Sequence, residues 1–130
     1  MRTVNKVILI GNITRDPLVK TTEGGKKVAL FTIATNRYYK DANGENQSEA
    51  EFTNCVTWGN LAERIETFLK KGKLVYAEGR LKTRKIEREE WDTLYKTEVV
   101  ISNIIFLDKR VHSDSSESTD ELDSIDSDIF

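Results

Sequence analysis

The sequence predicts an all-β fold in which five short strands close into a small barrel, with one helix between the third and fourth strands. Two patterns support this prediction. Runs of β-branched and apolar residues recur along the first 107 residues, separated by Gly, Asn and Asp turn signals. Residues 60–71 change instead to the apolar spacing of a helix. Residues 111–130 follow neither pattern.

Three strand-like runs precede the predicted helix, at residues 4–10, 28–36 and 51–58. Residues 16–27, between the first two, are predicted to be a loop or a short irregular strand that ends at the turn Gly24-Gly25. A polar loop at 41–46 carries an Asn-Gly turn signal. The third run alternates between two faces, with Phe52, Asn54, Val56 and Trp58 on one and Thr53, Cys55 and Thr57 on the other.

The helix is predicted from four apolar residues that share one face, namely Leu61, Ile65, Phe68 and Leu69. Asn60 suits the N-cap, and Gly72 suits a left-handed turn that ends the helix. We expect Phe31 and Phe68 in the core. The fourth strand is predicted at 73–79 and continues past Gly79 over 80–86, and the fifth at 95–107, although the charged segment 82–92 fits an exposed helix equally well. This order of elements is that of an OB-fold, whose surface binds oligonucleotides or oligosaccharides.

Charge divides the chain into two parts. Residues 1–110, the predicted OB-fold domain, contain all 20 Lys and Arg and 15 Asp and Glu, a net charge of +5. Residues 111–130 contain seven Asp and Glu and no Lys or Arg, a net charge of −7. Their Ser-, Asp- and Glu-rich composition cannot bury enough apolar surface to offset the entropy of ordering, so we expect a disordered acidic tail. A basic body with an acidic tail is typical of nucleic-acid-binding proteins.

Composition argues against several classes of function. The single cysteine, Cys55, cannot form an intrachain disulfide, and with the single histidine, His112, it cannot build a zinc site. We therefore predict no metal and no cofactor. The sequence has no phosphate-binding glycine motif. Its paired carboxylates lie in polar segments and are interpreted as solvated charges, so we expect no enzymatic activity. No apolar run approaches the roughly 20 residues of a membrane helix, and we expect a cytoplasmic protein.

Basic and aromatic residues alternate on the segments that would form one side of the barrel. They are Tyr38, Tyr39, Lys40, Phe52, Trp58, Lys82, Arg84, Lys85, Arg88, Trp91 and Tyr95. Aromatic rings stack on unpaired bases while cations contact phosphates, so this composition indicates binding of single-stranded nucleic acid. For Phe52 and Trp58, a place in the barrel core is an equally good interpretation. Tyr39, beside Lys40 and before a polar loop, favours the groove.

Several motifs resemble the bacterial single-stranded DNA-binding protein family over residues 3–107 and the last few residues. They are residues 4–12 (VNKVILIGN), 16–17 (DP), 32–36 (TIATN), 58–63 (WGNLAE), 71–72 (KG), 75–84 (VYAEGRLKTR) and 97–100 (TEVV). The resemblance implies an OB-fold, usually assembled as a homotetramer, that binds and protects single-stranded DNA in replication, recombination and repair. It also implies association with the nucleoid. An RNA-binding OB-fold module and a primosome-type interaction protein stay open as alternatives.

The resemblance implies that Tyr39, Phe52 and Trp58 stack on bases, and Trp91 is a fourth candidate because Ile86 stands where many members have a tryptophan. With Lys40, the candidate phosphate-binding residues are Lys6, Lys20, Lys71, Lys82, Arg84 and Lys85. Thr53 replaces a histidine that in some members supports the subunit interface, which leaves a dimer and a tetramer both open. Thr21 stands where a tyrosine is often found.

The last five residues are Asp126, Ser127, Asp128, Ile129 and Phe130. They lack the proline that usually precedes the last phenylalanine in this family. Acidic residues followed by two apolar ones can dock in an apolar pocket with a basic rim. We interpret this segment as a docking site for replication, recombination and repair proteins, and the alternative is a solubilising tail.

Overall fold

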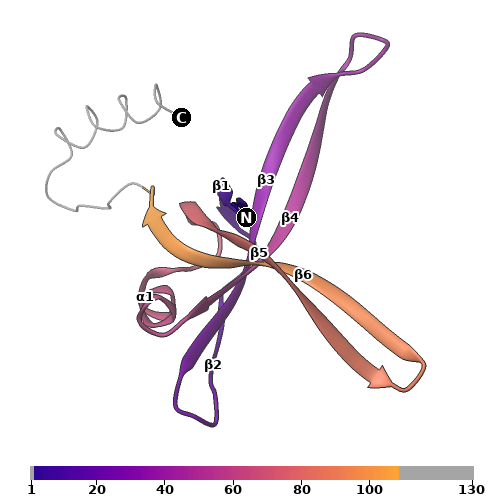
Figure 1. Cartoon of the computed structure of the whole chain (residues 1–130). Coiled ribbons are helices and arrows are strands. Elements are labelled where there is room, and N and C mark those ends of the chain that lie inside the picture. The colour runs from indigo at the N-terminus through magenta and orange to yellow at the C-terminus, as the bar shows by residue number, and fades with distance from the viewer. Residues whose placement is uncertain (1, 109–130) are drawn as a thin grey trace, which may run out of the picture.

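A computed structural model describes residues 2–108 as six strands and one helix (Figure 1). The elements are β1 (Val7–Ile13), β2 (Leu18–Thr21), β3 (Lys27–Lys40), β4 (Asn46–Trp58), α1 (Asn60–Phe68), β5 (Leu74–Glu89) and β6 (Asp92–Phe106). The predicted domain boundary after residue 110 and the predicted tail at 111–130 lie outside the described residues.

Five of the strands close into a barrel. The sheet runs in the order β1-β5-β6-β4-β3, and β1 also pairs with β3, which joins the two ends of the sheet. All pairings are antiparallel except that of β4 with β6, which is parallel and aligns Cys55 with Val99. Helix α1 connects the third and fourth barrel strands, β4 and β5. The OB-fold predicted from the sequence is therefore confirmed. The short strand β2 pairs with β3 outside this ring.

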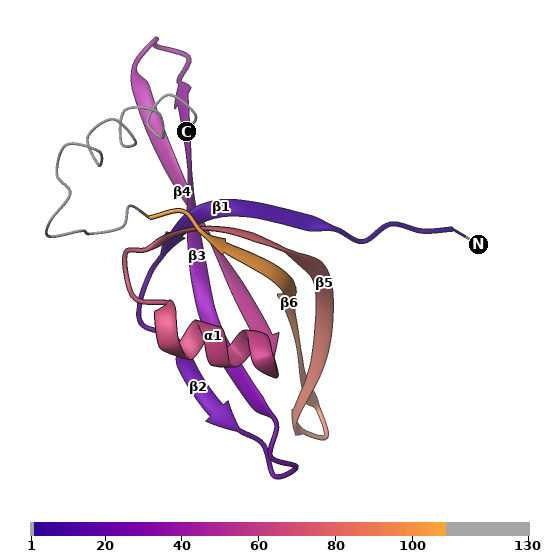
Figure 2. The ribbon, with the colours of Figure 1, turned by 90° about the vertical axis from the view of Figure 1, so that its left-hand side faces the viewer.

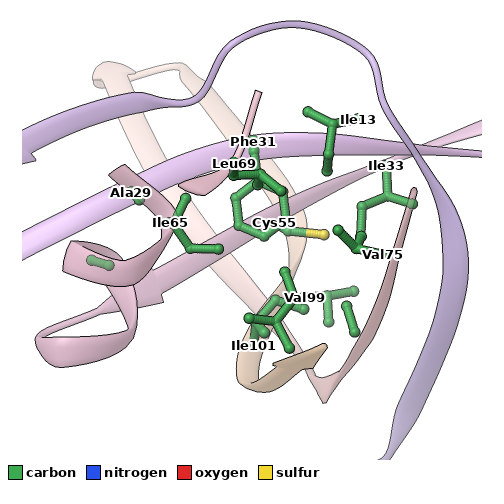
Figure 3. Packing of buried hydrophobic residues seen from close by; sticks show 13 residues of the cluster. Ile13, Ala29, Phe31, Ile33, Cys55, Ile65, Leu69, Val75, Val99 and Ile101 are labelled. Carbon is green, nitrogen blue, oxygen red and sulfur yellow. The ribbon is translucent and has the colours of Figure 1, made fainter. Parts of the chain in front are cut away.

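The core fills the barrel with apolar side chains from every barrel strand and from the helix (Figure 3). Phe31 and Ile33 of β3 and Cys55 of β4 are buried, which confirms the core position predicted for Phe31. Helix α1 lies beside the barrel (Figure 2). It contributes Ala62 and Ile65 to this core. Burying one face of the helix attaches it firmly, because most helical stability in proteins comes from such packing.

The prediction that Phe68 belongs to the core is wrong. Its side chain is 57% exposed, and its ring packs at the surface against Phe106, 6.0 Å away between ring centres. The predicted N-cap is also wrong, because Gly59 caps the helix and Asn60 is the first helical residue. Helix α1 ends at Phe68, and Gly72 has its positive φ in the following turn. The inward face consists of Ala62, Ile65 and the following Leu69, and Phe68 lies at its edge.

Two hairpins extend beyond the barrel as arms that point in different directions (Figure 1). The β3–β4 arm is paired up to Lys40 and Asn46, and the β5–β6 arm up to Glu89 and Asp92. Segment 82–92 is therefore a hairpin, and the interpretation as an exposed helix is excluded. The sequence predicted shorter strands because the arms are exposed on both faces. Their side chains no longer alternate between apolar and polar, although the backbone pairing continues.

Two glycines allow the barrel strands to approach each other closely. A Cβ atom at Gly11 would lie 2.2 Å from the carbonyl oxygen of Ala34, and one at Gly79 would lie 2.1 Å from that of Val100. Gly79 lies at a register shift between β5 and β6. Both contacts are with backbone, which cannot rotate away as a side chain can.

We expect the substitution Gly79→Ala to lower the free energy of unfolding by about 1–3 kcal/mol, the usual cost of overpacking. In a domain of this size the melting temperature should then fall by roughly 10 °C, measured by thermal denaturation. Gly24→Ala is the matched control, because its Cβ would meet nothing within 4 Å and Gly24 has no positive φ. Equal melting temperatures for the two variants would contradict the prediction.

Candidate nucleic-acid interface

The outer side of β3, β4, β5 and β6 forms a hollowed surface with an apolar floor, which we call the groove face. Its floor consists of Val28, Leu30, Val56 and Val100, whose neighbours in each strand point into the core. Two hollows lie on it, of about 410 Å³ and about 180 Å³. Leu30, Arg84 and Glu98 line both hollows. The alternation of the strands thus produces one buried face and one open face from the same segments.

Phe52 and Trp58 lie on the groove-face side of β4 and not in the core. The Phe52 side chain is 65% exposed and that of Trp58 is 43% exposed, which decides between the two interpretations left open by the sequence. Trp58 lines the smaller hollow, with the ammonium of Lys26 5.5 Å from its ring centre. Exposed rings above an apolar floor can stack on flat, partly apolar ligands.

The other two aromatic candidates lie on the arms. Tyr39 is near the end of the β3–β4 arm, where the guanidinium of Arg37 lies 4.6 Å from its ring centre. Strand alternation gives Tyr38, and not Tyr39, the same face as Phe52. Trp91 connects β5 to β6 at the tip of the other arm and is largely exposed. The structure therefore groups Phe52 with Trp58, and it places Tyr39 and Trp91 apart from them.

The structure brings only some of the seven candidate cations to the groove face. Lys82 and Arg84 line its hollows, and Lys20 pairs with Val28 at its edge. The other four lie elsewhere. Lys40 is at the end of the β3–β4 arm, Lys71 in the turn after α1, and Lys6 before β1. Lys85 pairs with Tyr95 on the opposite face of the β5–β6 arm. Arg15 and Lys96, which also line the larger hollow, were not selected from the sequence.

Three of the seven cations have carboxylate partners. The Lys6 ammonium lies 2.9 Å from Glu78, and that hydrogen bond raises the pKa of Lys6 and lowers the pKa of Glu78. Lys85 lies 3.2 Å from Glu87, and both side chains are exposed. Arg84 Nε donates to Glu98 Oε1 at 2.5 Å. The Lys85–Glu87 pair, exposed on both sides, contributes little to stability because water and salt screen it, whereas Glu98 in the Arg84 pair is buried.

Glu98 is the main site residue that sequence reasoning missed. It is only 5% exposed, and it lies on the groove face between the two hollows. The sequence does contain a signal for Glu98. It is a single acidic residue directly before the apolar run 99–101, and strand alternation puts it on the same face as Val100. A buried carboxylate in a basic groove needs a partner, and Arg84 supplies it.

Two features of the described residues bear on metal binding and on nucleophilic chemistry. Within residues 2–108, no group of three or more His, Cys, Asp or Glu could hold a metal ion. Burial, followed by the charge of Glu98, raises the pKa of Cys55 to about 12, so the thiol stays protonated at neutral pH and is a poor nucleophile. In the same part of the chain, α1 is too short and too polar to span a bilayer.

Comparisons with known proteins agree with this geometry. A model of the single-strand binding protein family matches residues 4–107. The chain is 43% identical over 115 residues to the single-stranded DNA-binding protein of Lactiplantibacillus plantarum, covering 88% of this chain and 56% of that protein. It is 42% identical over 107 residues to single-stranded DNA-binding protein A of Bacillus subtilis, covering 82% and 61%. The chain thus spans about three fifths of the length of these relatives.

A third relative, the single-stranded DNA-binding protein of Staphylococcus aureus, is 41% identical over 114 residues, covering 88% of this chain and 72% of that protein. A solved structure of a Plasmodium falciparum SSB in complex with ssDNA is similar with a TM-score of 0.76 and 34% identity. This similarity covers 83% of the chain and 98% of the solved one. Each of the bacterial relatives is named as a binding protein and not as an enzyme.

Proposed function

Because the chain belongs to the single-strand binding protein family, we propose that it binds and protects single-stranded DNA during replication, recombination and repair. Its role is binding without catalysis, and its place is with the DNA of the nucleoid. The observation that carries this proposal is the groove face, where exposed rings and cations surround an apolar floor large enough for bases.

The candidate residues divide between bases and phosphates. Phe52 and Trp58 stack on bases at the groove face, and Tyr39 and Trp91 offer rings further out, on the two arms. Such stacking contributes about 1–3 kcal/mol per base and tolerates any base. Lys20, Lys40, Lys71 and Lys82 contact phosphates, and each cation that neutralises a phosphate adds to the salt dependence of binding.

An RNA-binding module is the second candidate, because rings and cations alone do not distinguish the two nucleic acids. The 2′-hydroxyl separates them at a given site. The names of the relatives favour DNA. Titration with poly(dT) and with poly(U) under the same salt decides the point, and tighter binding of poly(U) would favour RNA. A primosome-type protein would bind partner proteins and neither polymer strongly.

We expect Phe52→Ala to weaken binding of poly(dT) about tenfold, since one stacking ring is lost. Quenching of Trp fluorescence during titration measures the affinity. Phe68→Ala is the matched control, because Phe68 is comparably exposed but lies on α1 against Phe106.

Equal losses in the two variants would show that Phe52 has no special role at the groove face. Absence of quenching by the unsubstituted chain, or a preference for duplex DNA, would refute the proposed function itself.

We also propose self-association into a homotetramer, or a dimer, through the outer face of β1. Ile8 and Ile10 alternate with core residues and are about half exposed, as is Ile105 on β6. Tyr76 pairs with both Ile10 and Ile105, so these three side chains form an apolar strip across β1, β5 and β6, and Ile8, which pairs with Glu78, extends it along β1. Such a strip on the outside of a barrel suits a contact between copies of the chain.

We expect Ile8→Glu to lower the mass measured by light scattering, because a charge on each copy would face the apolar strip of its partner. Val4→Glu is the control, since Val4 is more exposed still and lies before β1. The mass of the unsubstituted chain distinguishes tetramer from dimer. A monomeric mass at working concentration would rule out both.

We further propose that residues 1–110 form the DNA-binding domain and residues 111–130 a tail that recruits replication, recombination and repair proteins. The docking segment Asp126–Phe130 lies outside the described residues, and this proposal rests on its acidic and apolar sequence.

Deletion of residues 126–130 should abolish co-precipitation of a purified replication or repair enzyme of the same cell. It should leave DNA affinity equal or higher, because acidic residues compete with phosphate for cations. A chain carrying Ile129→Ser and Phe130→Ser, with its acids intact, tests whether the apolar residues are required. Unchanged co-precipitation after the deletion would contradict a docking role.

A further inference from the structure

Glu98 and Arg84 form a pair unlike the other ion pairs of the described residues. The Glu98 side chain is 5% exposed, whereas the carboxylates that pair with Lys6 and Lys85 are 28% and 69% exposed. A phosphate can replace an exposed carboxylate at little cost, because water then solvates the released group. Glu98 has no such access to water. If Arg84 turned to a phosphate, the buried Glu98 would lose the one ion-pair partner it has among the described residues, which is strongly destabilising unless the cross-strand Lys82 moved to replace it.

Arg84 is therefore already neutralised before DNA arrives. Its guanidinium is held through Nε to Glu98 Oε1, while half of its side chain stays exposed. A cation that keeps its carboxylate partner releases no counterion when DNA binds. Its charge is then of little use to a phosphate, but its flat guanidinium surface is still available.

In the smaller hollow, the surroundings of the pair suit a base better than a phosphate, whereas the larger hollow has two further cations, Arg15 and Lys96. Both hollows of the groove face are lined by Arg84 and Glu98. Around the smaller one lie Val28, Val56 and Trp58, which would leave a phosphate poorly solvated. Bases, by contrast, stack on guanidinium planes as they do on aromatic rings.

We propose that Arg84 and Glu98 form a nucleobase subsite of the groove face. Arg84 contacts a base, and Glu98 is the positioning residue that neutralises the guanidinium and holds it in place. This inference rests on the proposed binding of single-stranded DNA, and it changes the role of Arg84 from a phosphate contact to a base contact.

The test compares two ligands of equal length, oligo(dT) and a strand of abasic sugar-phosphate units, each titrated over a range of salt. The variant Arg84→Gln/Glu98→Gln removes both charges of the pair. Lys82→Gln is the matched control, because Lys82 lies on the same face of β5 and has no ion-pair partner among the described residues.

We expect the double variant to bind oligo(dT) about tenfold more weakly at every salt concentration, the loss of one stacked base. Its affinity for the abasic strand, measured at low salt, should not change. Lys82→Gln should weaken binding of both strands and reduce the slope of log K against log salt by about 0.7, the value for one phosphate on a single strand. Glu98→Gln alone should free Arg84 and steepen that slope by about 0.7.

A double variant that loses slope as Lys82→Gln does, or that weakens binding of the abasic strand, would overturn the base subsite in favour of a phosphate contact. Unchanged affinity for oligo(dT) would overturn any role of the pair in binding. Thermal denaturation checks that the double variant folds, and if it does not, the slope of Glu98→Gln decides. An unsubstituted chain that binds neither strand would instead refute the proposed function, and the subsite with it.

Discussion

Closure of the barrel is the constraint on which the other features depend. Strand β1 pairs with both β3 and β5, so the sheet has no free edge inside the ring. Closure requires tight curvature, and Gly11 and Gly79 stand where another backbone passes too close for a side chain. Once the ring is closed, alternate residues of each strand point in or out. The groove face therefore follows from the same pairing that forms the core.

Local alternation predicted the barrel part of the chain well, since each strand there has one buried side. The alternation of residues 51–58 between two faces was predicted, but the sequence did not say which face is buried, and the structure puts Cys55 inward and Phe52 and Trp58 outward. The lengths of the strands in the two arms were underpredicted. Both faces of each arm are exposed, so backbone pairing there produces no alternation of apolar and polar residues. Phe68 was misplaced because a helix of this length buries only a narrow stripe, which here runs through Ala62, Ile65 and the following Leu69 and leaves Phe68 at its edge.

The candidate site was predictable in its residue types but not in its pairing. Rings and cations could be recognised from their positions along predicted strands. That Arg84 meets Glu98 depends on the register of β5 against β6, two strands whose shift near Gly79 the sequence does not reveal. The same holds for Lys85, which strand alternation sends to the opposite face from Lys82 and Arg84. Counting basic residues therefore overstates the charge that faces a ligand.

Because fewer free cations face a ligand than the sequence suggests, we expect electrostatic attraction to contribute less to the binding free energy at the groove face. A body of net charge +5 is modest for a nucleic-acid binder, and part of its positive charge is already matched by carboxylates. Under the proposed function, affinity would then depend largely on stacked bases over the apolar floor, a contribution that salt screens weakly. It also gains if several copies bind one strand, because linked sites raise the effective concentration of each other. In that arrangement the apolar strip on β1 and the groove face support the same function, since the strip would bring together grooves that are individually weak.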